Sequence, residues 1–274
     1  MKTLQYRSRG PEVQFLEEIL ASMGYNVDVS FFFGQSTRQA VLDFQKKNNL
    51  VIDGIVGIKT WTKLLALNPQ VIQVHSKLLS EQDLINFAKE YSLELAAVKA
   101  VNAVESSGKG FLADARAKIL FEGHVFWREL KKRGVEPADF QNDQTKDVLY
   151  PKWTRRHYKG GAGEYDRLQK AANISQNPAF KEAAYRSASW GSFQIMGYHA
   201  DSLGYDSIDD FVNRMQQHER EHLNAFGKFL KVNKLIPHLK AKDWAKFAHG
   251  YNGPGYAQNR YDVKLQQAYE KFSI

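Results

Sequence analysis

Apolar side chains recur every three or four positions along most of this chain, a spacing typical of helices that bury one face. The first such helix is predicted from about residue 11 to 23, ahead of Gly24. Beyond residue 80 the pattern predicts a succession of further helices: 81–90, one that follows Ser92 as its cap and ends at Glu105, 118–132, 164–173, 178–187, 208–231, 242–249 and 261–272. The only later stretch compatible with a strand or small hairpin is 185–195. The expected fold class is therefore all-α or mainly α.

A weak internal repeat lies near the N-terminus. Its two copies, 33–41 and 56–64, each begin with an apolar residue and a Gly, and each places a Thr three positions after that Gly. Glycine permits a tight turn, and Thr37 or Thr60 is suited to cap the helix that follows. Together with the first predicted helix, the repeat indicates a small three-helix bundle.

A carboxylate interrupts the apolar stripe of the helix that ends at residue 105. Val98, Val101 and Glu105 fall at i, i+3 and i+7, so the acid occupies a position suited to an apolar side chain. Ser106 and Gly108 then end the helix, with Gly108 suited to a left-handed position. Burial and the partly negative helix end both raise the pKa of such a carboxyl. Glu105 is therefore a candidate general acid for glycosidic-bond cleavage; the alternative is a side chain that reaches solvent from a frayed end.

Composition narrows the range of functions. With 43% hydrophobic and 25% charged residues among 274, the chain is expected to be globular and long enough for two domains. It has no cysteine, which excludes disulfides and thiolate metal ligands. Neither a secretory signal nor a run of 18 apolar residues is found, so stable membrane insertion is not expected.

The net charge of +8 is distributed along the chain and suits a polyanionic partner such as an acidic cell-wall polymer. The densest basic runs, 131–133 and 155–159, are interpreted as solvated surface. No nucleic-acid-binding motif accompanies them, so no nucleic acid partner is expected.

The opening R-G-P-E-V-Q-F-L and the run D-G-I-V-G-I-K-T-W at 53–61 resemble the three-helix peptidoglycan-binding domain of bacterial and phage proteins. The resemblance covers residues 1–67 and implies a non-catalytic module that binds the cell wall. Asn68-Pro69 ends this unit, and 68–80 is expected to be a linker with some strand character at 71–74.

Three separated motifs follow in the rest of the chain: V-E-S at 104–106, S-W-G-S-F-Q-I-M at 189–196, and F-A-H-G-Y-N-G at 247–253. In this order they resemble the lysozyme-like superfamily of goose-type lysozymes and soluble lytic transglycosylases. The run A-K-I-L-F-E-G-H at 117–124 is similar to the N-acetylmuramidase domain of modular phage endolysins. The resemblance covers most of 81–274 and implies a lysozyme-like, α-helical catalytic domain.

The resemblance implies roles for the matching residues. Glu105 corresponds to the general acid that protonates the oxygen between N-acetylmuramic acid and N-acetylglucosamine, and Tyr251 to a catalytic-site aromatic close to that acid. Gly191 is expected to let the backbone approach the sugar. The residues expected to bind substrate are Ser106, Trp190, Gln194 and Asn252. For Trp190 the alternative is an ordinary place in the core.

Hydrolysis by the usual route also needs a second carboxylate. Glu122, in the I-L-F-E run, is the first candidate and Asp114 the second; for Glu122 a surface or capping acid is the alternative. Lytic transglycosylases use one acid and form an anhydro product, so transglycosylation of the same bond remains an alternative activity.

A rival motif belongs to another mechanistic class. His218, Glu219 and His222 satisfy H-E-x-x-H, which on a helix places two imidazoles one turn apart beside a glutamate, as in zinc peptidases. Against that reading, the surrounding stretch 213–224 is polar enough for a solvated face, and no third ligand follows at metzincin spacing. We therefore expect neither a metal nor a cofactor.

Together the motifs indicate a modular endolysin: a peptidoglycan-binding domain at 1–67, a linker at 68–80 and an N-acetylmuramidase domain at 81–274. Bacterial peptidoglycan is the expected partner, and the protein is expected to be a monomer. Such an enzyme would accumulate in the host bacterial cytoplasm and reach the wall through a holin-type lesion, as the resemblance implies.

Overall fold

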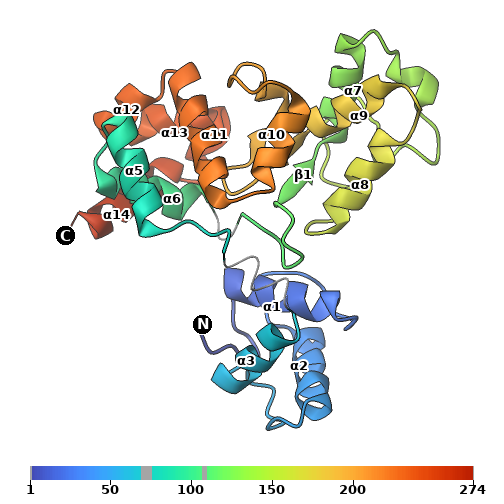
Figure 1. Cartoon of the computed structure of the whole chain (residues 1–274), viewed down its shortest axis with the longest axis vertical. Helices are drawn as coiled ribbons and strands as arrows, with labels where there is room; N and C mark the ends of the chain where they lie inside the picture. Colours follow the sequence, from blue (N-terminus) through green and yellow to red (C-terminus); the bar gives the residue numbers. More distant parts are fainter. Residues whose placement is uncertain (1, 69–75, 107–109, 274) are drawn as a thin grey trace. The chain divides into compact units, whose positions relative to one another are not determined.

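The computed structural model describes residues 2–68, 76–106 and 110–273, and it is mainly helical with one small sheet, as the apolar spacing predicts (Figure 1). The chain divides into two compact units: the first contains residues 1–76, 111–116 and 160–162, and the second contains 77–110, 117–159 and 163–274. The strand character expected at 71–74 and the helix-ending role expected of Gly108 lie outside the described residues.

The first unit is a bundle of three helices, α1 (Pro11–Ser22), α2 (Gln35–Lys47) and α3 (Ile58–Ala66). Each helix contributes apolar side chains to one core, to which the segments between them add Leu4, Phe33 and Val56. The buried helical residues of this core include Val13, Leu16, Ile19, Leu20, Val41, Phe44, Trp61 and Leu64. Two isolated β-bridges, Leu4 with Val56 and Arg9 with Phe32, connect the non-helical segments.

The internal repeat marks two helix starts of the same geometry. Gly34 (φ −84°, ψ −168°) and Gly57 (φ −85°, ψ −171°) are the N-caps of α2 and α3. The expectation that Thr37 and Thr60 cap these helices is therefore wrong, because both lie at the third helical position and are buried. The Thr37 hydroxyl instead donates to the buried Glu17 carboxylate of α1, 2.7 Å away.

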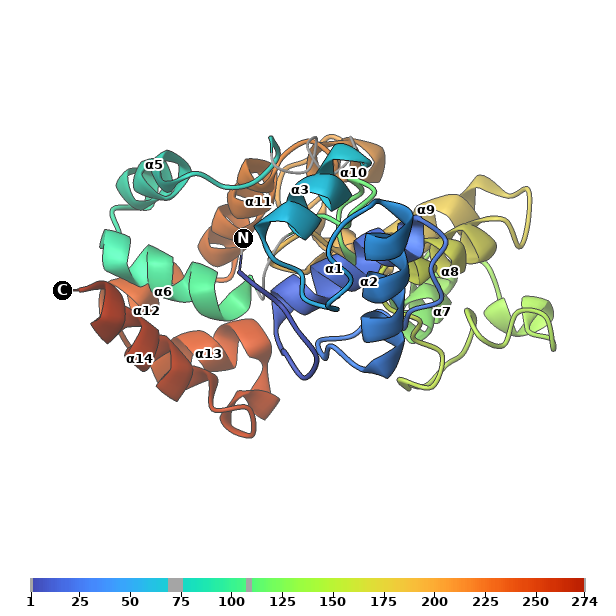
Figure 2. The same ribbon diagram turned by 90° about the horizontal axis from the view of Figure 1, so that it is seen from below.

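The second unit contains the remaining elements. They are α5 (Glu81–Tyr91), α6 (Leu95–Glu105), β1 (Ile119–Phe121), α7 (Gly123–Lys132), α8 (Gly163–Ala172), α9 (Pro178–Arg186), β2 (Ala188–Trp190), β3 (Ile195–Met196), α10 (Ile208–Met215), α11 (Glu219–Val232), α12 (Ile236–Lys240), α13 (Trp244–Asn252) and α14 (Tyr261–Phe272). Short 3₁₀ turns lie at Pro137–Phe140, Gly197–His199 and Pro254–Ala257. Figures 1 and 2 show α6 lying beside α14, which also packs on α13, and α7, α8 and α9 forming a separate group.

Side-chain caps fix several of these helix starts. Ser80 and Asp83 form a reciprocal capping box at α5. Asn177 caps α9 by accepting from the backbone N–H of Ala179. Ser92 does not cap the helix that leads to Glu105; it ends α5 in a left-handed conformation, and Glu94 is the N-cap of α6.

Two predicted helices are broken in the structure. The first part of 118–132 is strand β1, whose Ile119 and Phe121 pair with Trp190 and Ala188 of β2. β2 then pairs with β3, so the sheet order is β1-β2-β3, all antiparallel. The predicted helix 208–231 is interrupted at 216–218, which separates α10 from α11.

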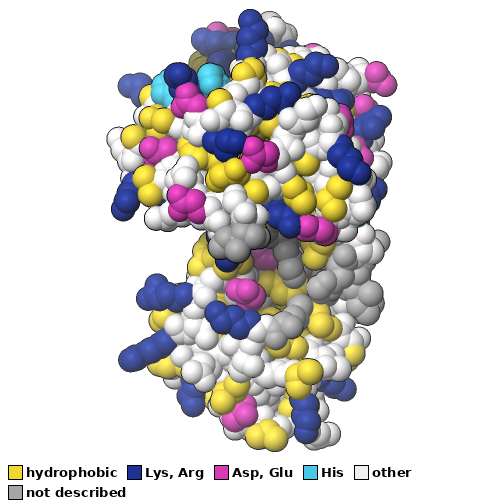
Figure 3. All heavy atoms as spheres, turned by 90° about the vertical axis from the view of Figure 1, so that its left-hand side faces the viewer, with side chains coloured by type: hydrophobic (Ala, Val, Ile, Leu, Met, Phe, Trp, Pro, Cys, Tyr) yellow, Lys and Arg dark blue, Asp and Glu magenta, His cyan; other side chains and the backbone are white. Residues whose placement is uncertain are grey.

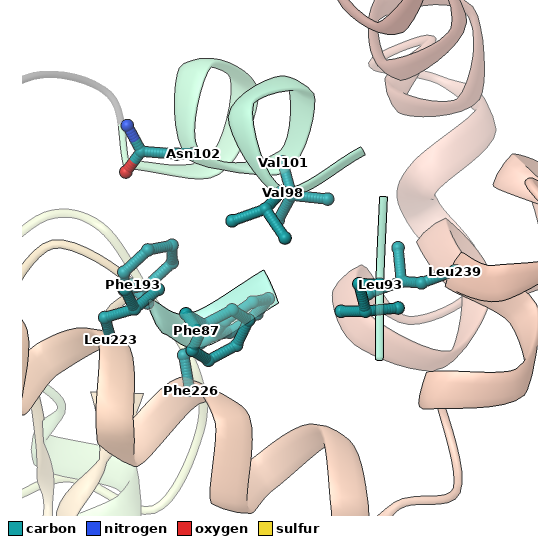
Figure 4. Close-up of a pocket in the computed structure, with 9 residues that line it drawn as sticks. All are labelled: Phe87, Leu93, Val98, Val101, Asn102, Phe193, Leu223, Phe226 and Leu239. Carbon is teal, nitrogen blue, oxygen red and sulfur yellow. The ribbon is translucent and has the colours of Figure 1, made fainter. Parts of the chain in front are cut away.

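The apolar face of α6 packs on a dense core. Val98 and Val101 point into a cavity of about 10 Å³ toward Phe226 of α11 (Figure 4). That volume is at the lower limit of the space one water molecule needs. The other residues around the cavity are Phe87, Leu93, Asn102, Phe193, Leu223 and Leu239. α6 is thus packed on the core through Val98 and Val101.

Charged side chains are mixed over the surface that Figure 3 presents, where Lys and Arg are scattered among Asp and Glu. This agrees with the distributed net charge of +8. Within the described residues, none of the helices has the length and apolar character required to cross a bilayer.

Candidate active site

A cleft of about 390 Å³ lies in the second unit at the C-terminal end of α6. Elements far apart in sequence contribute to it: the end of α6, the turn after β2, β3, α11, the end of α13 and the start of α14. Its lining residues are Glu105, Phe193, Gln194, Ile195, Met196, Tyr198, His199, Phe229, Tyr251, Asn252 and Tyr261. The cleft brings together residues from all three sequence motifs.

Glu105 is the last residue of α6 and is half-buried at the cleft wall. Burial raises the pKa of its carboxyl to about 6, although a hydrogen bond from Asn252 and the charge of Lys264 act in the opposite direction. The apolar stripe that carries Val98 and Val101 into the core therefore carries the acid into the cleft. A carboxyl with this pKa is partly protonated near neutral pH and can donate a proton.

The end of α13 positions two residues against Glu105. The Asn252 side-chain amide donates to Glu105 Oε1 at 3.0 Å. Tyr251 lines the same cleft, but its hydroxyl donates to the Phe193 carbonyl at 2.7 Å. Burial raises the Tyr251 pKa well above its usual value, so the hydroxyl keeps its proton. Gly253 ends the helix at φ 75°, a left-handed conformation that favours glycine.

The Gly191–Gln194 turn joins β2 to β3 and forms the opposite wall. The Gln194 amide group donates to the Gly191 carbonyl at 2.7 Å and accepts from the Ser189 hydroxyl at 2.8 Å. Phe193 stacks on Phe226, with ring centroids 4.5 Å apart. Gln194 thus lies at the cleft, but its amide is largely occupied in holding the turn.

His222 lies directly beneath this turn and is fixed in one neutral form. Its Nδ1 accepts from the backbone N–H of Ser192 at 3.1 Å, and its Nε2 donates to the Met215 carbonyl at 2.7 Å. Burial lowers the His222 pKa to about 4. A Cβ on Gly191 would lie 2.5 Å from this ring, so the close approach that requires glycine is to His222, not to a sugar as the sequence suggests.

The H-E-x-x-H residues do not fit a zinc site. Both ring nitrogens of His222 have backbone partners that fix its protons, and His218 uses Nδ1 to cap α11. The buried Glu219 accepts from the backbone N–H groups of Leu79 and Gly110. The expectation of a solvated polar face is also wrong here, because Glu219 and His222 are buried.

Two residues predicted to bind the saccharide have other roles in the structure. Trp190 is only 1% exposed and packs between Tyr185 and Tyr165, so its indole is a core side chain. This corrects its assignment as a sugar-stacking residue. Ser106 caps α6, and its hydroxyl donates to the Asn102 carbonyl at 2.5 Å; it does not line the cleft.

The candidate second carboxylates do not line the cleft either. Glu122 is the N-cap residue of α7 and accepts from the Tyr158 hydroxyl, which lies 2.7 Å from both carboxylate oxygens. Asp114 forms an ion pair with Arg116 in the 111–116 segment, which groups with the first unit. Among the described residues, Glu105 is the only carboxylate that lines this cleft.

Several cleft residues were missed by the sequence analysis. His199 and Tyr198 follow β3 and lie against each other, and the ring of Phe229 in α11 meets His199 edge-on at 5.2 Å. Tyr261 begins α14, with Lys264 one turn later. The only sequence signal for this wall is the predicted helix at 261–272, which does not reveal that its start faces α6.

Comparisons with known proteins match a different family to each of the two compact units described above. An N-acetylmuramidase family model covers residues 94–273, and a peptidoglycan binding domain model covers residues 9–64. Among solved structures, the crystal structure of a Burkholderia AP3 phage endolysin is similar, with 41% sequence identity and a TM-score of 0.67. The match covers 99% of each chain.

Proposed function

The chain belongs to the N-acetylmuramidase family and is a peptidoglycan glycosidase, and from this premise we propose that it is an endolysin that hydrolyses the bond between N-acetylmuramic acid and N-acetylglucosamine, with Glu105 as general acid. The observation that carries the proposal is the half-buried Glu105 carboxyl in the cleft, with its pKa raised to about 6. No other carboxylate of the described residues lines that cleft.

The proposed reaction begins with protonated Glu105. It donates its proton to the glycosidic oxygen, and the bond from that oxygen to the anomeric carbon breaks. The departing sugar leaves with a neutral hydroxyl, while the anomeric carbon becomes electron-deficient. A water molecule adds its oxygen to that carbon, and its proton restores the Glu105 carboxyl. Asn252 holds one carboxylate oxygen and thereby fixes the direction of the proton.

Lytic transglycosylation of the same bond is the second candidate, because it needs only one acid, and one carboxylate lines the cleft among the described residues. In that reaction a hydroxyl of the muramyl sugar replaces water and forms an anhydro ring. Mass spectrometry of digested sacculi distinguishes the two: reducing muramyl ends support hydrolysis, and anhydromuramyl ends contradict it.

Glu105→Gln is the direct test of the acid. The amide keeps the shape and loses the proton, so we expect cleavage of purified peptidoglycan to fall by at least roughly a hundredfold. Glu90→Gln, an exposed acid on α5, is the matched control and should cleave like the wild type. A folded Glu105→Gln protein with near-wild-type activity would contradict the proposal.

Glu122 remains the sequence-based candidate for a partner carboxylate, and two variants separate its possible roles. Glu122→Gln removes the charge, whereas Tyr158→Phe removes only the hydrogen bond to it. Loss of cleavage in Glu122→Gln alone supports a catalytic role. Equal loss in both variants indicates that the contact is structural.

The first unit is proposed to hold the enzyme on the wall, which the family match at 9–64 supports. We further propose the setting that the sequence resemblance implies: a monomer that accumulates in the host cytoplasm, reaches the wall after holin-type release, and lyses the cell.

A further inference from the structure

Three aromatic side chains of the first unit face solvent instead of its core. Phe31 is 53% exposed, Tyr6 43% and Phe32 37%. Elsewhere in the described chain only Trp153, at 58%, is an aromatic residue exposed to a similar degree. The other Phe and Trp side chains of the unit are buried: Phe15, Phe33, Phe44, Trp61 and Phe111. The core is therefore complete without the three exposed rings.

The backbone that carries these rings is well ordered by hydrogen bonds. The N–H of Arg7 donates to the Phe33 carbonyl at 3.0 Å, and the N–H of Phe33 donates to the Ser8 carbonyl at 2.9 Å. The N–H of Gly10 donates to the Phe31 carbonyl at 3.0 Å. Three backbone hydrogen bonds, around the isolated bridge of Arg9 with Phe32, thus join the segments 6–10 and 30–33 that carry the rings.

The buried carboxylate of Glu17 also holds the 30–33 segment through hydrogen bonds. Glu17 of α1 accepts from the backbone N–H of Ser30 at 2.6 Å and from the hydroxyl of Thr37 at 2.7 Å. Burial raises the Glu17 pKa in spite of these hydrogen bonds. The segment that presents Phe31 and Phe32 is therefore fixed before any ligand arrives, which reduces the entropy lost on binding.

Two arginines accompany the rings. The Arg9 guanidinium carbon lies 4.6 Å from the Phe32 ring centroid, and that of Arg7 lies 5.5 Å from the Tyr6 centroid. Neither arginine forms an ion pair with a carboxylate of the described residues. Their planar guanidinium groups are thus available to a carboxylate of a ligand, to which guanidinium can form two parallel (bidentate) hydrogen bonds.

We propose that the first unit binds the glycan strand of the cell wall with the exposed side chains on these two joined segments, Tyr6, Arg7, Arg9, Phe31 and Phe32, which we call the aromatic face. The rings pack on the apolar faces of the sugars, and the arginines bind the carboxylates that the wall carries. The inference rests on the wall-binding function proposed above and assigns it to five residues.

The other exposed apolar residues of the unit make a contrast. They are aliphatic and lack a flat ring for a sugar to stack on: Val29, Val51, Ile52, Ile55, Ile58 and Leu67. Ile58 is the most exposed of them and serves as the matched control for a loss of apolar surface within the same unit. Trp153, with the Arg155 guanidinium 5.5 Å from its ring, is the matched control for an aromatic–arginine pair in the other unit.

The test measures sedimentation of the full-length protein with purified sacculi, in a Glu105→Gln background that prevents digestion. We expect Phe31→Ala and Tyr6→Ala each to weaken binding roughly fivefold, and the double variant more than tenfold. Phe31→Trp should bind like the parent because it keeps a ring. Arg9→Gln should weaken binding at low salt and less so at high salt, since its contribution is electrostatic.

Ile58→Ala and Trp153→Ala should bind sacculi like the parent. Parent-like binding by the ring variants, or an equal loss in either control, would overturn the proposal. Weaker binding to single-stranded DNA without weaker binding to sacculi would assign the face to nucleic acid instead. If the parent protein does not sediment with sacculi at all, the wall-binding function itself is refuted. If the parent sediments and the ring variants bind equally well, only the assignment to the aromatic face is refuted.

Discussion

Opposing effects meet at the Glu105 carboxyl. Burial raises its pKa, while the amide of Asn252 and the charge of Lys264 favour the ionised form; the result is about 6. In the proposed mechanism, burial would keep the proton on Glu105 before the reaction, and these two partners would stabilise the carboxylate afterwards. Removing Asn252 or Lys264 should therefore raise the pKa of Glu105.

The pH dependence of cleavage follows from this balance. Because the acid must be protonated, kcat/KM on soluble glycan fragments should fall as pH rises through about 6. Asn252→Ala and Lys264→Gln each remove an effect that lowers the Glu105 pKa, so this limb should move to higher pH. Lys271→Gln, farther along α14, should leave it in place. A limb that moves to lower pH in Asn252→Ala would contradict the assignment.

The buried neutral His222 predicts a pH-dependent stability. Its pKa falls from 6.5 to about 4 on folding, so the unfolded chain binds a proton more readily. The folded state therefore keeps this contribution above pH 6.5 and loses it as pH falls toward 4, by about 3 kcal/mol in total. Urea unfolding across this range measures it.

His222→Gln provides the comparison. Glutamine retains a donor for the Met215 carbonyl but has no imidazole to protonate. The variant should be less stable at neutral pH, and its free energy of unfolding should change less with pH than that of the wild type. Identical slopes in the two proteins would mean that His222 does not titrate on unfolding.

At the residue scale, the sequence predicted those groups whose signal is local. Glu105 stood out because it interrupts an apolar stripe, and Gln194, Tyr251 and Asn252 because they lie in motifs. The burial of Trp190 could not be predicted in this way, since it depends on rings at positions 165 and 185 that pack around it. The roles of Glu105, Gln194, Tyr251 and Asn252 in catalysis and binding remain predictions.

At the scale of elements, the turn between β2 and β3 depends on α11 beneath it. Gly191 has φ +72°, and a Cβ there would also overlap the His222 ring. The turn carries Phe193 and Gln194 to the cleft wall. A change at Gly191 should therefore disturb both folding and the cleft.

Gly191→Ala is compared with Gly204→Ala, whose φ is also +72° but whose Cβ would meet nothing within 4 Å. The backbone strain common to both should cost about 1 kcal/mol of unfolding free energy, and the overlap with His222 should bring the Gly191→Ala loss to about 3 kcal/mol. Chemical denaturation measures the difference. Equal losses would show that the ring moves aside freely.

The elements show which signals a sequence carries. Ser80, Asn177 and Ser207 mark helix starts because a cap is made with a backbone N–H two or three residues away. The local pattern at 118–132 predicts helix through β1, because the strand forms only by pairing with β2, which lies about 70 positions away in the sequence. The break before α11 was also missed, since it depends on His218 capping a new helix within a polar stretch.

At the scale of the whole molecule, the chain pairs a three-helix unit with a catalytic unit. Binding by one unit raises the local concentration of substrate for the other. Deletion of residues 1–67 should therefore reduce binding to sacculi by at least roughly tenfold, while kcat/KM on soluble glycan fragments stays within about twofold. Circular dichroism of the remaining chain verifies its fold. Equal losses on both substrates would show that the first unit contributes to the chemistry itself.

The N-terminal part of α11 supports two segments at once: His222 accepts a hydrogen bond from the β2–β3 turn, and Glu219 accepts one from Gly110, five residues after Glu105. One helix thus contacts both the turn that lines the cleft and Gly110, which lies beyond the end of α6. We therefore expect a change that unfolds the start of α11 to disturb both segments together. Sequences that keep Glu219 and His222 at this spacing would then preserve two structural contacts, not a set of metal ligands.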